Sequence, residues 1–126
     1  MPHITVEYSS NLVDLDESWV MLQLNRSLLN LGIFMDADIK TRMVRHSSFR
    51  VGVDAAELGN QAFVAAEVAL LSGREFSTQE MLGQVVLKTL ERCCQGSMEA
   101  GLQTQVTVHV TELQSELYFK SVLKAR

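Results

Sequence analysis

The hydrophobic pattern of the first half of the chain predicts a strand, a helix and a second strand. Apolar residues occupy every second position at the start, which predicts a strand over residues 3–8 with one buried face. A helix is expected next, with Asp14 or Asp16 as its N-cap and Gly32 beyond its end. Residues 39–46 are again typical of a strand. The apolar stripe expected along the helix consists of Val20, Met21, Leu24, Leu28 and Leu31.

The second half of the chain repeats this order. Residues 62–71 are almost continuously apolar, as expected for a central strand that is covered on both faces. The S-x-x-E pattern of residues 77–80 has the form of a capping box and predicts the start of a helix that ends between Gln95 and Gly101. Residues 105–111 alternate and predict a last strand. The buried positions expected in these elements are Met81, Leu82, Val85, Val86, Leu90, Cys93, Cys94, Val106, Val108 and Val110.

The doubled order of strand, helix and strand predicts an α+β fold in one domain, residues 1–126. Two pseudo-repeats of about 1–60 and 61–126 meet at a turn region expected over residues 52–60. Right-handed crossovers place both helices on one face of a four-stranded mixed sheet. The first strands of the two units are too apolar for solvent on the other face, so we expect self-association. Three such sheets closing into a ring, a homotrimer, satisfy this requirement.

Composition and charge exclude several functions. The net charge is −4 with a pI near 5.3, which argues against a general nucleic-acid binder because such proteins need a broad basic surface. The most apolar run is short and contains Glu67, and no leader-like segment opens the chain, so we expect a cytoplasmic protein without a membrane span.

The sequence carries no metal or cofactor motif. The adjacent Cys93 and Cys94 lack the spacing of a metal or redox motif and are expected to be buried helical thiols. The histidines His3, His46 and His109 are scattered and fit no metal-ligand spacing. Glycine loops for phosphates or dinucleotides are missing as well, so neither a metal nor a cofactor is predicted.

The only proline, Pro2, directly follows the first methionine. Removal of Met1 leaves the ring nitrogen of Pro2 as a free secondary amine, which is able to act as a base. An α-amino group has a pKa of about 7.7–8.0, and burial lowers it towards neutrality, where general acid–base catalysis is most effective. Proline is also common at this position in chains where it has no catalytic role.

Basic residues gather in one part of this acidic chain. Lys40, Arg42, Arg45 and Arg50 supply four of its eleven lysines and arginines. At strand spacing Lys40 and Arg42 point the same way, and such a pair is able to grip carboxylates. A charged edge strand explains the same pattern. Arg74 follows a predicted central strand, where ligands of α/β sheets often bind, although taken alone it is better explained as a cation of a surface loop.

Together these features resemble the tautomerase superfamily, and within it the 5-carboxymethyl-2-hydroxymuconate isomerases. The resemblance extends over almost the full length of the chain. Its more specific parts are the first segment, residues 2–7, and the Gly-Ile-Phe turn at residues 32–34. The matching segments are residues 2–7, 32–34, 39–42, 73–74 and 117–120.

The resemblance implies a homotrimeric, cofactor-free isomerase of unsaturated 2-hydroxy polycarboxylic acids from aromatic-ring degradation. By analogy, Pro2 is the catalytic base, and Lys40, Arg42 and Arg74 hold the substrate carboxylates and stabilise the dienolate. Phe119 helps to wall the pocket. Lys40 departs from the family pattern, which has arginine there, and it gives up bidentate binding.

Two alternative functions remain open at this point. One is a tautomerase with the same base that acts on a simpler keto–enol acid such as phenylpyruvate. The other is a non-catalytic trimeric binding protein that has kept the fold, because a fold alone does not settle function.

Overall fold

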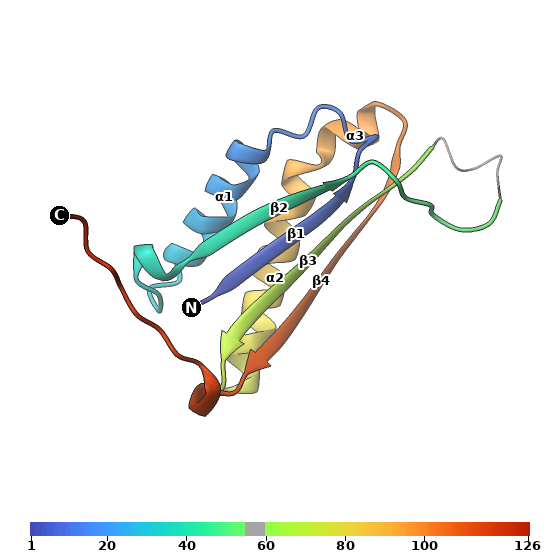
Figure 1. Ribbon diagram of the computed structural model, residues 1–126. Coiled ribbons are helices and arrows are strands. Elements are labelled where there is room, and N and C mark those ends of the chain that lie inside the picture. Colours follow the sequence, from blue (N-terminus) through green and yellow to red (C-terminus); the bar gives the residue numbers. More distant parts are fainter. Residues whose placement is uncertain (55–59) are drawn as a thin grey trace.

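A four-stranded sheet carries two long helices on one of its faces (Figure 1). The structure, a computed structural model, describes residues 1–54 and 60–126. The predicted turn over residues 52–60 therefore lies partly outside the described residues. The elements in chain order are β1 (His3–Ser9), α1 (Glu17–Leu29), η1 (Asp36–Asp38), β2 (Lys40–His46), β3 (Gln61–Leu71), α2 (Phe76–Cys93), α3 (Gln95–Glu99), β4 (Gln103–Leu113) and η3 (Ser115–Leu117).

The sheet has the strand order β2-β1-β3-β4 and is mixed, as predicted. Within each β-α-β unit the two strands are parallel: His3 pairs with Lys40, and Gln61 pairs with Gln103. The two units join through the antiparallel pair β1 and β3, in which His3 pairs with Ala69. This arrangement brings the beginnings of β1 and β2 and the end of β3 to the same end of the sheet.

The core lies between the sheet and the two helices. Successive strand residues point to opposite faces, so the apolar residues of β1 all reach the helix side, whereas β3 sends alternate apolar residues to the helix side and to the open face. Asp16 caps α1, as one of the two predicted candidates, by accepting a hydrogen bond from the main-chain nitrogen of Trp19 at 3.2 Å. Fully buried residues of the core include Ile4, Val6, Val20, Leu24, Leu28, Val64, Val68, Leu82, Val86 and Leu90.

The predicted start of α2 is wrong. The helix begins at Phe76, so Ser77 lies inside its first turn and does not form the N-cap of a capping box. The main-chain oxygen of Glu75 accepts hydrogen bonds from the nitrogens of Thr78 and Gln79, both at 3.1 Å, and no side chain caps the helix. Met81 was expected in the core but is 42% exposed, because the buried stripe of this helix is centred on other positions. That stripe consists of Leu82, Val86, Thr89 and Leu90.

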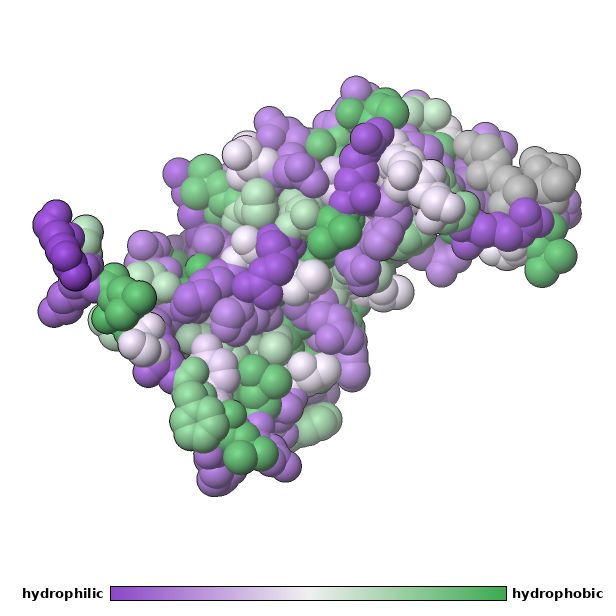
Figure 2. All heavy atoms as spheres, in the orientation of Figure 1, coloured by the Kyte–Doolittle hydropathy of each residue, from purple (hydrophilic) through white to green (hydrophobic). Residues whose placement is uncertain are grey.

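The open face of the sheet is more polar than predicted. The expectation that the first strands of both units are too apolar for solvent is wrong for β1, because its apolar residues all lie on the helix side. Two contacts between polar side chains cross the open face, His46 with Glu7 at 2.8 Å and His109 with Glu67 at 3.2 Å. The space-filling view shows hydrophilic residues over much of this face, with apolar groups gathered towards its lower end (Figure 2).

Two leucines on α1 test the assignment of the core. Leu24 is fully buried, whereas Leu22 on the same helix is 46% exposed. We expect Leu24→Ala to lower the free energy of unfolding by about 2–5 kcal/mol, since it removes buried methyl groups and leaves a cavity. Leu22→Ala is the matched control and is expected to cost well under half as much. Urea unfolding at one fixed protein concentration measures both, and equal losses would contradict the assignment.

Candidate functional site

A pocket of about 240 Å³ opens at the end of the sheet where β1 begins. Two glycines with left-handed backbone shape its rim. Gly32, with a φ of 76°, ends the turn after α1, and Gly73, with a φ of 115°, turns the chain after β3. Because residues with side chains rarely adopt these angles, glycine is required at both turns. The pocket is lined by Met1, Ile33, Phe34, Met35, Asp38, Leu71 and Arg74.

Pro2, the second residue of the chain, is buried. Its main-chain oxygen accepts a hydrogen bond from the nitrogen of Lys40 at 3.1 Å, which continues the β1–β2 ladder to the first residues of the chain. Met1, the residue before it, lines the pocket. The ladder therefore holds the N-terminal end of the chain against the pocket.

The charges around the pocket weaken the basicity of the N-terminal amine. Burial removes water from the amine of Met1 and is the largest cause that lowers its pKa below the ordinary value of 8.0. The cations Lys40, Lys120 and Arg74 lower the pKa further, whereas the carboxylate of Asp38 raises it. The surroundings thus favour the neutral amine, which is the form that accepts a proton.

Arg74 is one of the residues that line the pocket. Its guanidinium lies 4.8 Å from the centre of the Phe34 ring, within the range of a cation–π interaction. One of its nitrogens, Nη2, also donates a hydrogen bond to the main-chain oxygen of Ile33 at 3.5 Å. Arg74 is held at the rim by contacts from the turn after α1.

Lys40 and Arg42 occupy alternate positions of β2 on the open face of the sheet, beside the pocket and not among its lining residues. Lys40 Nζ donates to the main-chain oxygen of Asp38 at 3.3 Å. Nη2 of Arg42 lies 2.8 Å from Nδ1 of His3 on the neighbouring strand β1. Of these two cations, Lys40 lowers the pKa of the N-terminal amine, and Arg42 is not among the causes of that shift.

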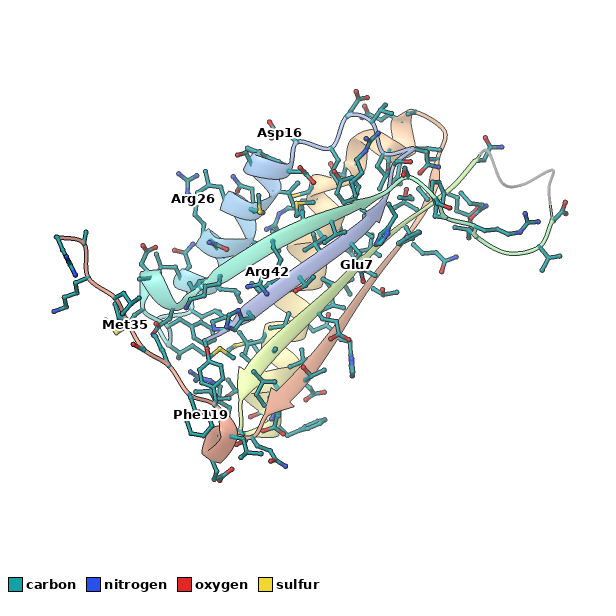
Figure 3. The ribbon with its side chains drawn as sticks, viewed as in Figure 1. Glu7, Asp16, Arg26, Met35, Arg42 and Phe119 are labelled. Atoms are coloured by element: carbon teal, nitrogen blue, oxygen red, sulfur yellow. The ribbon has the colours of Figure 1, made fainter. Side chains whose placement is uncertain are left out.

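Phe119 lies outside the pocket of this chain. It follows η3 in the C-terminal segment, is 85% exposed, and is absent from the residues that line the pocket (Figure 3). The predicted role of Phe119 as a pocket wall is therefore not fulfilled within a single chain.

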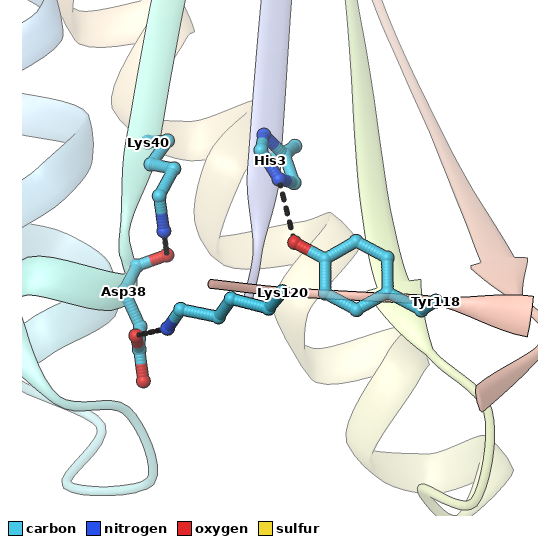
Figure 4. A network of polar contacts seen from close by, with 5 residues as sticks. All are labelled: His3, Asp38, Lys40, Tyr118 and Lys120. Carbon is cyan, nitrogen blue, oxygen red and sulfur yellow. Dashed lines mark hydrogen bonds and ion pairs between the residues drawn. The ribbon is translucent and has the colours of Figure 1, made fainter. Parts of the chain in front are cut away.

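The sequence interpretation missed the polar contacts that tie the C-terminal segment to the site (Figure 4). Lys120 Nζ forms an ion pair with Asp38 Oδ1 at 2.9 Å, and Nε2 of His3 lies 3.2 Å from the hydroxyl of Tyr118. The hydrogen bond from Lys120 lowers the pKa of the Asp38 carboxyl. The only sequence signal for these contacts was the resemblance of residues 117–120 to the family.

The two cysteines show no features of a reactive site. Cys93 and Cys94 are free thiols, and burial raises the pKa of Cys94 to about 11, which makes it a poor nucleophile. Among residues 1–54 and 60–126, no three His, Cys, Asp or Glu residues are grouped so that they could hold a metal ion. No helix in the described part of the chain is long and apolar enough to cross a membrane.

Comparison with known proteins identifies the family. The family model of 5-carboxymethyl-2-hydroxymuconate isomerase matches residues 2–123. The chain belongs to this family. It is therefore an isomerase of the tautomerase type, as the resemblance implied. No curated protein matches the chain.

Solved structures share the fold of this isomerase family. A 5-carboxymethyl-2-hydroxymuconate isomerase from Deinococcus radiodurans R1 superposes with a TM-score of 0.83 at 22% identity, over 95% of this chain and 88% of that chain. A 5-carboxymethyl-2-hydroxymuconate delta-isomerase gives 0.84 at 19% identity, over 97% and 88%. A fused 4-OT protein described as a symmetric trimer gives 0.59 at 15% identity, over 89% and 85%.

The opposing effect of Asp38 on the N-terminal amine is testable. We expect Asp38→Asn to lower the pKa of this amine further, because it removes the negative charge that stabilises the protonated form. The measurement is the pH dependence of selective acylation of the N-terminal amine, on protein whose first residue is known from its intact mass. Asp36→Asn, in the same 3-10 turn, is the matched control and should leave the pKa unchanged. A rise in the Asp38→Asn protein would refute this account of the charges.

Proposed function

We propose that this protein moves a proton within an unsaturated 2-hydroxy di- or tricarboxylic acid, such as 5-carboxymethyl-2-hydroxymuconate, without a cofactor. Pro2 is the general base in this proposal. The observation that carries it is the pocket at the N-terminal end of the chain, where burial and three cations lower the pKa of the Met1 amine. We infer that the same surroundings lower the pKa of the Pro2 amine once Met1 is removed. The family assignment supports the same chemistry.

The reaction requires that Met1 is removed, because an acylated proline nitrogen is an amide and has no basicity. The free secondary amine of Pro2 takes the proton from the enol hydroxyl, which leaves a conjugated dienolate. The protonated amine then returns this proton to a distant carbon of the conjugated system, and the product is the ketone. A base whose pKa lies near the working pH performs both transfers efficiently.

The cations of the site suit the charges of such a substrate. Arg74 at the pocket, with Lys40 and Arg42 beside it, holds the carboxylates and stabilises the negative charge that develops on the dienolate. Two or three cations match a polycarboxylate better than a single carboxylate. This favours a dicarboxylic or tricarboxylic acid over a phenylpyruvate-like substrate. The origin of this acid in aromatic-compound degradation and a place of action in the cytoplasm are further parts of the proposal.

A homotrimer is part of the proposal. The fused 4-OT protein of the same fold is described as a symmetric trimer. The C-terminal segment carries apolar side chains that find no cover in a single chain, and these are Leu117, Phe119, Val122 and Leu123. Association of subunits would cover them, and the proposed role of Phe119 as a pocket wall requires either such association or a movement of the segment.

The first test concerns Pro2. We expect Pro2→Ala to slow turnover of 2-hydroxymuconate by about a hundredfold, because it replaces the secondary amine with a less suited primary amine at the base position. Intact mass spectrometry must first show that Met1 is absent from both proteins. The same protein with Met1 retained is the internal control and should be inactive. Unchanged turnover of Pro2→Ala would exclude Pro2 as the base, and a fully active protein with Met1 retained would do the same.

The second test concerns Arg74. We expect Arg74→Gln to lower kcat/KM for 2-hydroxymuconate by about ten- to a hundredfold, because it removes a charge-assisted hydrogen bond to a carboxylate. The loss should be smaller for the monocarboxylate phenylpyruvate. Arg26→Gln, at the last turn of α1, is the control and should have little effect. Equal losses on both substrates would argue against a polycarboxylate as the preferred substrate.

A further inference from the structure

His3 connects two polar side chains that come from different parts of the chain. Its Nδ1 lies 2.8 Å from Nη2 of Arg42 on β2, and its Nε2 lies 3.2 Å from the hydroxyl of Tyr118 in the C-terminal segment. The edge-on packing of the two rings, with centroids 6.4 Å apart, also brings His3 and Tyr118 together (Figure 4). His3 directly follows Pro2 and is paired with Lys40 in the sheet.

The chemistry of arginine decides the tautomer of His3. A guanidinium has only donors, so Nδ1 of His3 must accept the hydrogen bond from Arg42 and carries no proton. The proton of the neutral ring is therefore on Nε2, which donates to the oxygen of Tyr118. The hydroxyl proton of Tyr118 is then left to donate to another group.

A protonated His3 is incompatible with this arrangement. A proton on Nδ1 would replace the acceptor with a donor, and the ring would carry a positive charge beside Arg42. The charged groups that face His3 are Arg42 and Lys40 from β2 and the N-terminal amine from its own strand, while its partner on β3, Ala69, is uncharged. Burial is the largest cause that lowers the pKa of His3 below its ordinary value of 6.5, and these three basic groups lower it further.

We propose that His3 is a positioning residue, which as the neutral Nε2–H tautomer orients Arg42 towards a carboxylate of the substrate. The inference rests on the proposed function in one respect, the carboxylate ligand of Arg42. It adds a residue that touches no reacting atom and acts through the arginine. It also makes substrate binding depend on pH, because binding weakens as the pH falls and His3 gains a proton.

The contact itself is tested without substrate. In ¹⁵N spectra of the full chain labelled at histidine, we expect His3 to show the neutral Nε2–H tautomer at pH 7. Its pKa should rise in Arg42→Gln, because that change removes a neighbouring positive charge. His109, which pairs with Glu67 at the far strand β4, is the internal control and should not shift. A proton on Nδ1 at pH 7, or an unchanged pKa in Arg42→Gln, overturns the inference.

The effect on carboxylate binding is tested with cis,cis-muconate, a dicarboxylate that has no enol hydroxyl to lose a proton. His3→Asn keeps an acceptor oxygen near the place of Nδ1 but cannot titrate, whereas His3→Leu has no acceptor. We expect the Kd of the wild type to rise as the pH falls from 7 to 5, and that of His3→Asn to stay nearly constant. His3→Leu should bind about tenfold more weakly at pH 7, as the loss of a hydrogen bond to a charged group predicts. His109→Leu should bind like the wild type.

Turnover separates this inference from the proposed function. With 2-hydroxymuconate, His3→Leu should raise KM and lower kcat by a smaller factor, because the base is untouched while Arg42, which holds the carboxylate and stabilises the dienolate, loses its support. Equal Kd values for His3→Asn, His3→Leu and the wild type across this pH range overturn the inference. If the wild type binds muconate with the expected differences but isomerises no enol acid, the proposed reaction fails and the role of His3 stands.

Discussion

The antiparallel pairing of β1 with β3 is the constraint on which the rest of the structure depends. It joins two parallel β-α-β units edge to edge, so the beginning of β1 lies beside the end of β3. Arg74, which follows β3, is thereby brought to the pocket that also contains the first residue of the chain. The parallel partner β2 places Lys40 at the same end of the sheet. Each group of the site comes from a different element, and the sheet brings them together.

Three cations of this acidic protein lie close enough to the N-terminus to affect its amine. Lys40, Lys120 and Arg74 all act on the N-terminal amine, and the desolvation of that amine adds to their effect. Asp38 opposes them, and its ion pair with Lys120 also attaches the C-terminal segment to the site. The protonation state of the amine is therefore a balance between burial and neighbouring charges. A tautomerase that uses an amine as its base needs such a balance.

The parts of the site that could be predicted depend on regular spacing. Strand alternation is sufficient to place Lys40 and Arg42 on one face, and the position of Arg74 after a strand indicated an edge of the sheet. The ion pair of Asp38 with Lys120 could not be predicted this way, because the two residues are far apart in sequence and meet through an irregular segment. The error at residues 77–80 had a different cause: the S-x-x-E pattern was present, but main-chain contacts of Glu75 begin the helix earlier.

The sequence by itself determined the order of the elements, the apolar faces that build the core and the family, because these depend on local periodicity and on short motifs. Only the tertiary structure decided which side chains meet at the N-terminus and how polar the open face of the sheet is, because both depend on which strands pair and in which direction. The tautomer of His3 belongs to the second group, since it follows from an arginine that a neighbouring strand places 2.8 Å away. Such contacts between distant residues leave no periodic trace in the sequence.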